Sequence, residues 1–447
     1  MKRMYPIRCR FVACEFLIVT TFSWLATGMF SHAVYADEPN ASVSKASEED
    51  EIAELRRRAL EAAAFEDGES TTEDLGVTIS DLDQIPVLPG GLGVLPPVEF
   101  PSENPQTPEK VELGRMLYFD LRLSKDFSMS CATCHDPEKG WADGLPRSTG
   151  FGGIELGRHS PTVINTAFNG PQFWDGRAHG LEAQAVGPVM AAGEMNMGSE
   201  EVVLERIHEA DEYEGRFEAV FGKSPSLQLI GDAIAAFERT VVTTDAPFDR
   251  YVLGEKDALS DSEKRGLILF FTKASCTACH SGPNFTDNKF HNLGVKQLGP
   301  LTDDVGRYAV TKDEKDRGAF KTPTLRNVSQ TAPYMHDGSL ATLEEVVDFY
   351  NRGGVRQSNR SKLIQPLSLT DQQKADLVAF LRSLTGSLPE ITSPPGEFFG
   401  TGTLRRAAVA DSSVSHNETL PVSNERPISQ ESQKRSSRPP CFKSGQK

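Results

Sequence analysis

The sequence contains one six-residue pattern twice, and this repeat constrains the fold more than any other feature. Ser130-Cys131-Ala132-Thr133-Cys134-His135 recurs as Ser275-Cys276-Thr277-Ala278-Cys279-His280. Two cysteines three apart, followed at once by histidine, are the attachment pattern of a c-type haem. Each thiol can add to one vinyl group of the haem, and the histidine then lies under the iron, for which imidazole is a good ligand. We therefore expect two covalent haems, attached through Cys131 and Cys134 with His135, and through Cys276 and Cys279 with His280.

The sequence around the two patterns is also repeated. Apolar stretches that begin with a similar Leu-Gly or Arg-Gly step precede both, at residues 113–119 and 265–271. An aromatic residue and an aspartate follow each pattern, Trp141 with Asp143 and Phe285 with Asp287. A single Cys-x-x-Cys could be half of a zinc site, but two chance matches would not also share similar flanking sequences. The repeat predicts a mainly α protein with two cytochrome c-like domains, each built around one covalent haem.

Composition, turn-forming residues and helix caps divide the chain into five parts. Proline and glycine are dense between residues 81 and 108, and Ser, Pro, Arg and Gln dominate after residue 388. Capping boxes at Ser260 with Glu263 and at Thr370 with Gln373 predict the first and last helices of the second domain. We expect a signal peptide at 1–36, an acidic Pro/Gly-rich leader at 37–106, an N-terminal domain at 107–253, a C-terminal domain at 254–388 and a disordered tail at 389–447.

The N-terminus and the cysteines indicate export. Basic residues precede an apolar run near residues 16–30, and Val34-Tyr35-Ala36 suits a signal peptidase. An uncleaved membrane anchor is the alternative. Of seven cysteines, two lie in the signal, four belong to the haem patterns and Cys441 is alone in the tail, so none is left to pair in a structural disulfide. Since c-type haem is attached outside the cytoplasm, we expect a periplasmic protein.

The net charge of −16 comes mainly from the leader. Residues 37–110 carry 18 acidic and five basic side chains. Nothing in this distribution favours binding to nucleic acid. The acidic leader could attract a basic partner protein, or it could simply keep the chain soluble.

Four further stretches point to a known family. They lie between and after the haem patterns, at residues 158–165, 172–178, 322–328 and 331–338. In sequence and in order they strongly resemble the bacterial di-haem cytochrome c peroxidases, which include the MauG-type enzymes. The resemblance covers about residues 107–386. It implies two packed cytochrome c domains that reduce hydrogen peroxide to water with electrons from a small periplasmic donor, a cytochrome c or a cupredoxin. Members are often dimers, so a homodimer stays open.

The resemblance also implies roles for individual residues. His135 matches the proximal ligand of the peroxidatic haem, and His280 matches that of the electron-transfer haem. Trp174 matches the tryptophan between the haems. Gln184 and Glu194 match the distal pocket, with Glu194 as acid/base. A carboxylate within hydrogen-bond reach could move a proton between the two peroxide oxygens, and burial against a haem would raise its pKa.

The sequence departs from many family members at the sixth iron ligands. Where these have a histidine that caps the peroxidatic iron, this chain has Phe151, which cannot bind a metal. The first haem is therefore expected to keep an open face. The sixth ligand of the second haem falls on Tyr350, as in MauG-type members, where other peroxidases have methionine. Met335 is the alternative ligand. Phenolate favours ferric iron, whereas thioether favours ferrous iron.

The family also places calcium between the domains. The two carbonyl ligands would come from Thr331 and Pro333. The asparagine ligand is replaced by His159, a poor ligand for a cation that prefers oxygen. Calcium through the carbonyls and water is left open.

Three functions follow from these features. The first is a peroxidase that uses a small donor protein. The second is a MauG-like enzyme that oxidises residues of a protein substrate, which Tyr350 and Phe151 favour. The third is a non-catalytic di-haem electron carrier or sensor, against which Phe151 and Glu194 argue.

Overall fold

The computed structural model describes residues 77–301 and 303–402. The predicted signal peptide, most of the acidic leader and the tail beyond residue 402 lie outside the described residues. Helices dominate the described part, as expected, and none of them is long and apolar enough to cross a membrane.

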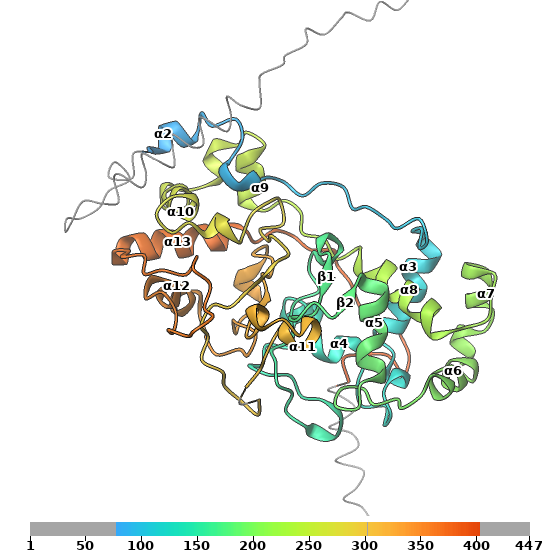
Figure 1. Cartoon of the computed structure of the whole chain (residues 1–447). Helices are drawn as coiled ribbons and strands as arrows, with labels where there is room; N and C mark the ends of the chain where they lie inside the picture. The colour runs from blue at the N-terminus through green and yellow to red at the C-terminus, as the bar shows by residue number, and fades with distance from the viewer. Residues whose placement is uncertain (1–76, 302, 403–447) are drawn as a thin grey trace, which may run out of the picture. The chain divides into compact units, whose positions relative to one another are not determined.

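The helices gather in two groups that follow the sequence repeat. In Figure 1, α3, α5, α6, α7 and α8 lie on one side, and α10, α12 and α13 lie on the other. The α-helices are α2 (Ile79–Leu82), α3 (Pro108–Tyr118), α4 (Cys131–Cys134), α5 (Leu181–Met190), α6 (Glu200–His208), α7 (Arg216–Phe221), α8 (Leu227–Glu238), α9 (Pro247–Val252), α10 (Asp261–Phe271), α11 (Tyr308–Thr311), α12 (Leu343–Asn351) and α13 (Asp371–Ser383).

Short elements connect these helices. The described part of the chain contains two antiparallel strand pairs, β1 (Pro171–Gln172) with β2 (Ala178–His179) and β3 (Phe290–His291) with β4 (Phe320–Lys321). The 3-10 turns are η2 (Pro89–Gly91), η3 (Leu121–Leu123), η4 (Pro137–Lys139), η5 (Phe151–Gly153), η6 (Thr166–Phe168), η7 (Asp211–Tyr213), η8 (Lys256–Ala258), η9 (Cys276–Ala278), η10 (Glu314–Asp316) and η11 (Val328–Gln330).

The predicted caps of α10 and α13 are confirmed. The Ser260 hydroxyl accepts from the Glu263 backbone N–H at 3.4 Å, and the Glu263 carboxylate accepts from the Ser260 backbone N–H at 2.7 Å. Thr370 and Gln373 do the same at α13. Each box satisfies two backbone donors that a helix start otherwise leaves without a partner.

A glycine lets two helices of each domain cross closely, α3 with α8 in the first and α10 with α13 in the second. A Cβ on Gly114 of α3 would overlap the carbonyl oxygen of Ala233 and press on Phe237, both on α8. This explains why each apolar stretch contains one glycine although glycine disfavours a helix. The second domain repeats the crossing between α10 and α13 with Gly266, Asp376 and Phe380.

Each domain has its own apolar core around three aromatic rings. The ring centroids of Tyr118, Trp141 and Phe237 lie 5.1 to 6.1 Å apart. The same triangle, with distances of 5.1 to 6.3 Å, is formed in the second domain by Phe270, Phe285 and Phe380. Aromatic pairs at these distances and steep angles are favourable beyond the area they bury.

Buried polar side chains join the two domains near their centre. The Thr243 hydroxyl accepts from Asn165 Nδ2 at 3.0 Å and donates to Asn327 Oδ1 at 2.9 Å. Asn165 and Asn327 are equivalent in the repeat, and both have left-handed backbones. One threonine thus connects the same position of both domains.

The predicted disordered tail begins too early. Residues 389–402 pack on the first domain, where the backbone N–H of Leu121 donates to the Phe398 carbonyl at 2.8 Å. The Ser130 hydroxyl, beside the first haem pattern, donates to the Gly400 carbonyl at 2.6 Å. The guanidinium of Arg122 lies 4.9 Å from the Phe398 ring and 5.3 Å from the Phe399 ring. These contacts hold Phe398 and Phe399 on the first domain, although the polar residues around them in the sequence suggested disorder.

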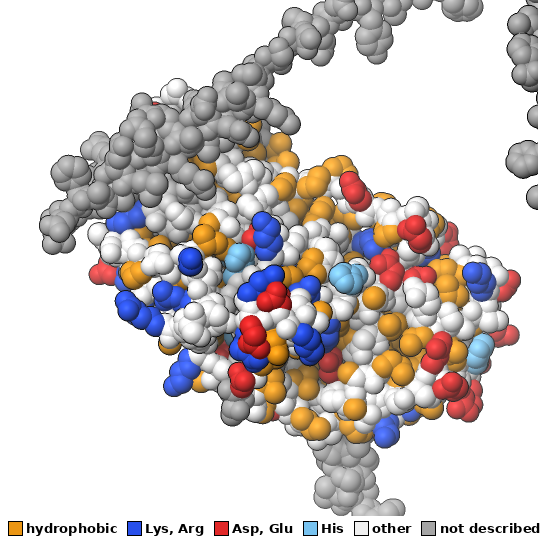
Figure 2. Space-filling view, in the orientation of Figure 1, with side chains coloured by type: hydrophobic (Ala, Val, Ile, Leu, Met, Phe, Trp, Pro, Cys, Tyr) orange, Lys and Arg blue, Asp and Glu red, His pale blue; other side chains and the backbone are white. Residues whose placement is uncertain are grey.

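Acidic side chains also gather outside the leader. Figure 2 shows them over α6 and α7 of the first domain. Exposed members are Glu201, Glu205, Glu209 and Glu218. Charges of both signs lie close together near α11, where Lys315 pairs with Asp313 at 2.8 Å and Arg317 with Glu314 at 2.9 Å.

Candidate haem centres

The first haem site comprises Cys131, Cys134 and His135. The cysteines begin and end the short helix α4, and His135 follows directly. The Tyr118 hydroxyl donates to the His135 carbonyl at 2.8 Å, and the Ser160 hydroxyl lies 3.2 Å from His135 Nδ1. Burial lowers the pKa of His135, with the nearby Asp143 charge opposing it. A neutral imidazole held at Nδ1 leaves Nε2 as a metal ligand.

The second haem site, Cys276, Cys279 and His280, repeats this arrangement. His280 Nδ1 lies 2.9 Å from the Phe285 carbonyl oxygen, and burial lowers the pKa of the ring. Phe285 and its counterpart Trp141 both have left-handed backbones, with φ of 52° and 59°. The repeat thus places the Phe285 carbonyl at Nδ1 of His280 and the Trp141 carbonyl near the ring of His135.

The loops after each histidine are held in the same way. Thr162 Oγ1 donates to the Gly140 carbonyl at 2.7 Å, and Thr324 Oγ1 donates to the Asn284 carbonyl at 2.8 Å. Both threonines belong to the Pro-Thr steps in two of the family-like stretches. Each threonine thus ties its own segment to the residue directly before the aromatic residue, Gly140 before Trp141 and Asn284 before Phe285.

A cavity of about 680 Å³ adjoins the second haem site. The size falls within the roughly 300–1,000 Å³ of small-molecule and cofactor sites. Burial raises the pKa of the Cys276 thiol to about 12. None of the four cysteines of the two patterns forms a disulfide within the described residues. Two free thiols and a histidine with an available Nε2 fit a c-type haem. The cavity is also lined by Trp174, Met335, His336, Tyr350 and Leu381.

Both candidate sixth ligands face this cavity. Tyr350 lies on α12, and burial raises its pKa. Its hydroxyl makes no hydrogen bond to a residue in the described ranges. Met335 lies in a loop with a left-handed backbone, φ 71°. A tyrosine hydroxyl in an apolar surrounding normally has a partner. The structure brings both side chains to the second haem site.

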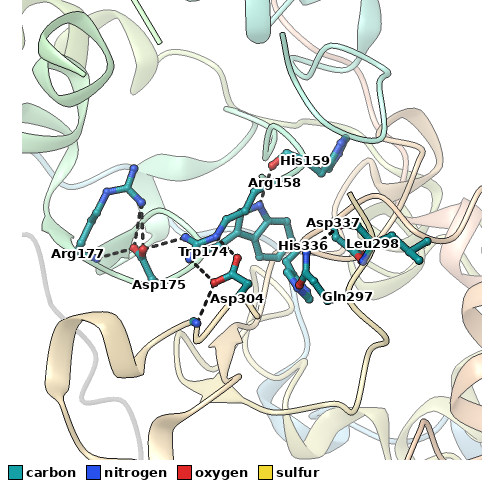
Figure 3. A network of polar contacts seen from close by, with 11 residues as sticks. Arg158, His159, Trp174, Asp175, Arg177, Gln297, Leu298, Asp304, His336 and Asp337 are labelled. Carbon is teal, nitrogen blue, oxygen red and sulfur yellow. Dashed lines mark hydrogen bonds and ion pairs between the residues drawn. The ribbon is translucent and has the colours of Figure 1, made fainter. Parts of the chain in front are cut away.

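Trp174 lines the cavity at the second haem site. Figure 3 shows its indole beside His159 and His336. Its Nε1 donates to the His159 carbonyl at 2.9 Å, and its own carbonyl accepts from the Lys321 N–H at 2.8 Å. Since Ser160 follows His159 and touches His135, the chain connects the first histidine to an indole that lines the second cavity.

Ion pairs fix the segment that carries Trp174. Arg158 pairs with Asp175 at 2.8 Å and with Asp304 at 2.6 Å (Figure 3). Burial would raise the pKa of Asp175, but hydrogen bonding and charge from Arg158 and Arg177 outweigh it, so the pKa is lowered. Paired and ionised groups of this kind hold the backbone at Asp175, directly after the indole.

Glu194 and Phe151 lie next to each other. The Phe151 N–H donates to the carbonyls of Glu194 and Gly193, at 2.9 and 3.2 Å. Burial raises the pKa of Glu194, and the Arg177 charge opposes it. No ion pair or hydrogen bond of the Glu194 carboxylate is found among residues 77–301 and 303–402. Gln184 is partly buried on α5, which ends four residues before Glu194.

The residues at the predicted calcium position do not fit that cation. His159 Nδ1 lies 2.8 Å from the Leu145 carbonyl oxygen. Burial lowers the pKa of His159. The carbonyls of Leu145 and Thr331 act in the opposite direction, because both accept hydrogen bonds from the ring. The Thr331 carbonyl, one of the two proposed calcium ligands, thus faces an imidazole. The imidazole offers nitrogen at a position where calcium, which takes six to eight ligands, prefers oxygen.

We therefore expect the purified protein to hold no stoichiometric calcium. Treatment with a chelator should leave both haem spectra unchanged, and His159→Asn should create calcium binding measurable by titration calorimetry. Elemental analysis with one tightly held calcium per chain, whose removal changes the spectra, would contradict this expectation.

Two side chains beside the second haem site had no role in the sequence analysis. His336 stacks on Phe320 with centroids 3.6 Å apart, and its Nε2 lies 2.8 Å from Gln297 Oε1. Burial lowers the pKa of His336 to about 4. Burial also lowers the pKa of Lys321 to about 8. One family-like stretch contains His336 and another begins directly after Lys321, but only the fold shows that both line the cavity.

Two histidine-bearing cysteine pairs, each in its own small helical domain, define a di-haem c-type cytochrome. Family models match both halves, "Di-haem cytochrome c peroxidase" over residues 108–257 and "Cytochrome c" over residues 264–385. The chain belongs to the di-haem cytochrome c peroxidase and MauG family, as the sequence analysis expected, and is an oxidoreductase of that family.

Its relatives include both kinds of enzyme. The methylamine utilization protein MauG of Methylorubrum extorquens is 45% identical over 299 residues, 66% of this chain and 84% of the relative. The cytochrome-c peroxidase IdrP1 of a Pseudomonas species is 41% identical over 335 residues, 68% and 88%. A crystal structure of a MauG-like protein associated with microbial copper homeostasis is 34% identical, with a TM-score of 0.61, over 65% of this chain and 93% of that one.

Proposed function

We propose that this protein is a periplasmic peroxidase that reduces hydrogen peroxide to water with electrons from a small donor protein. The observation that carries the proposal is Glu194, a carboxyl with a burial-raised pKa and without a hydrogen-bonding partner among the described residues. Phe151, whose side chain cannot bind iron, adjoins it. A proton-transfer group beside an uncapped iron is what peroxide cleavage requires.

The reaction consumes one peroxide, two protons and two electrons and yields two waters. Cys131, Cys134 and His135 would hold the haem of the first site, which would supply the iron chemistry that cleaves the O–O bond of peroxide. Glu194 accepts a proton from one peroxide oxygen and passes it to the other, which leaves as water. Gln184 orients the peroxide. Trp174 links the second haem site to the first, and the donor protein delivers electrons to the second.

Export is part of the proposal. The expected signal at 1–36 lies outside the described residues, and c-type haem is attached outside the cytoplasm. A cytochrome c or a cupredoxin is the proposed donor. The homodimer remains a prediction.

Two assays test the proposed function. Oxidised protein mixed rapidly with peroxide should change its haem absorbance, and steady-state assays with a reduced small cytochrome should show peroxide-dependent oxidation of the donor. Absence of both responses in a protein that contains both haems would leave the electron carrier or sensor as the better account.

The second candidate, a MauG-like enzyme that oxidises residues of a protein substrate, is favoured by Tyr350. Tyrosine at this position and 45% identity to a MauG agree with that reading. A long-lived spectral change in oxidised protein with peroxide alone would support it. A requirement for prior reduction of one haem would support the donor-dependent peroxidase.

We expect Tyr350 to be the sixth ligand of the second haem. Tyr350→Phe should change the low-spin spectrum of that haem and raise its reduction potential, because the anionic phenolate stabilises ferric iron. Met335→Leu is the matched control and should leave both unchanged. A changed spectrum in Met335→Leu and an unchanged one in Tyr350→Phe would identify Met335 as the sixth ligand.

A further inference from the structure

The repeat pairs one residue of the first domain with a residue of very different chemistry in the second. In α8, Phe237 packs on Gly114, and in α13, Phe380 packs on Gly266. Glu238 follows the first phenylalanine, and Leu381 follows the second. Leu381 lines the cavity of the second haem site. By the repeat, Glu238 therefore occupies the position at the first haem site that an apolar side chain occupies at the second.

Neighbouring groups place Glu238 near the first haem site independently. Burial raises the pKa values of Tyr118 and Cys131, and the charge of the nearby Glu238 carboxylate raises them further. Tyr118 lies on α3 and holds the His135 carbonyl, and Cys131 is an attachment cysteine. The carboxyl thus lies beside the edge at which a haem would be tethered.

The carboxyl of Glu238 lacks a close partner. The residue is 5% exposed, and no hydrogen bond or ion pair of its carboxylate is found within the described part of the chain. Two charged groups act on it, Arg239 of its own helix and Glu182 of α5. They pair with each other at 2.8 Å, so their charges largely cancel at Glu238. Buried carboxyls are normally paired, which makes this one exceptional.

We propose that Glu238 takes up a proton when the first haem is reduced. A ferric haem is more positive than a ferrous one, so it favours the carboxylate more strongly. One electron added to the ferric haem and one proton added to the Glu238 carboxylate give a ferrous haem and a neutral carboxylic acid. The electron comes from the donor protein through the second haem. The proposal requires the first haem to be attached but does not require peroxide turnover.

The proton exchange falls in an accessible pH range. Burial raises the pKa of Glu238 to about 8. Reduction of the adjacent iron would raise it further, because positive charge is lost nearby. Between the lower pKa of the ferric state and the higher pKa of the ferrous state, reduction takes up a proton, and the potential must fall as pH rises.

The test is a spectroelectrochemical titration of both haems between about pH 6 and pH 10, a range that spans the burial-raised pKa. The potential of the first haem should fall with pH by at most about 59 mV per unit, the one-electron equivalent of a tenfold change in proton activity. In Glu238→Gln the slope should disappear. Glu238→Leu, which copies the second domain, should also abolish it and provides a second variant should the first fold poorly.

Two controls separate Glu238 from other groups. Glu194→Gln should keep a slope, because Glu238 is intact in that variant. The second haem, which has Leu381 at the equivalent position, should keep its own pH dependence in the Glu238 variants. A flat wild-type potential, or an unchanged slope in Glu238→Gln, would overturn the proposal. A protein without the first haem would instead remove the basis of the proposed function.

Discussion

Glu194→Gln is expected to lower kcat/KM for peroxide by about 10²- to 10⁴-fold, the usual contribution of a positioned acid/base. Glutamine keeps the size of the side chain but can no longer carry a proton from one peroxide oxygen to the other. Haem content and resting spectra should be unchanged, because the Glu194 carboxylate holds no other described residue in place. Steady-state kinetics with a reduced small cytochrome measure the effect.

The matched control is Glu205→Gln, an exposed glutamate on α6. It removes the same charge from the same domain and should leave kcat/KM unchanged. A Glu194→Gln variant with wild-type kcat/KM would show that another group moves the proton.

The pH profile gives a second signature of Glu194. Its carboxylate must be ionised to accept a proton, and burial raises its pKa above the ordinary 4.5. Activity should therefore be present above this raised pKa and be lost as pH falls through it. The acidic limb of kcat/KM should disappear in Glu194→Gln. A limb that persists in the variant would belong to a different group.

Trp174→Phe is expected to lower donor-dependent turnover by an order of magnitude or more. The indole lines the second cavity, and its N–H holds the carbonyl of His159, next to the residue that touches His135. Phenylalanine fills much of the same space but lacks the N–H and is harder to oxidise. Rapid mixing should separate the two steps, with peroxide binding retained and electron delivery from the second haem slowed.

Trp141→Phe is the control for loss of an indole. That tryptophan is buried in the aromatic triangle of the first domain, so its replacement should affect stability more than electron delivery. Equal electron-transfer rates in wild type and Trp174→Phe would remove the indole from the proposed route.

The sequence was most informative where the chemistry is local. Haem attachment needs cysteines at a fixed spacing, and a capping box needs a hydroxyl and a carboxylate or amide three residues apart, so both were predicted from neighbouring residues. Duplication of the flanks also predicted two similar helical domains. The glycine and aromatic residues of each helix crossing had a visible signal in the repeat, namely Gly114 with Gly266.

Long-range contacts were not predictable in this way. Phe398 and Phe399 lie in a polar stretch, and nothing local indicates that they pack beside Arg122 on the first domain. Glu238 resembles an ordinary charged residue at a helix end until the fold buries it. The carbonyls that face His159 come from segments far apart in the chain. Burial of a polar group depends on partners that one stretch of sequence does not contain.

The most direct test of the central claim is the haem content of the denatured protein. Two covalently attached haems per polypeptide should survive denaturation and solvent extraction, as counted by absorbance and intact mass. The paired replacement of Cys276 and Cys279 by alanine should leave one. Fewer than two haems retained by the wild-type chain would contradict the account.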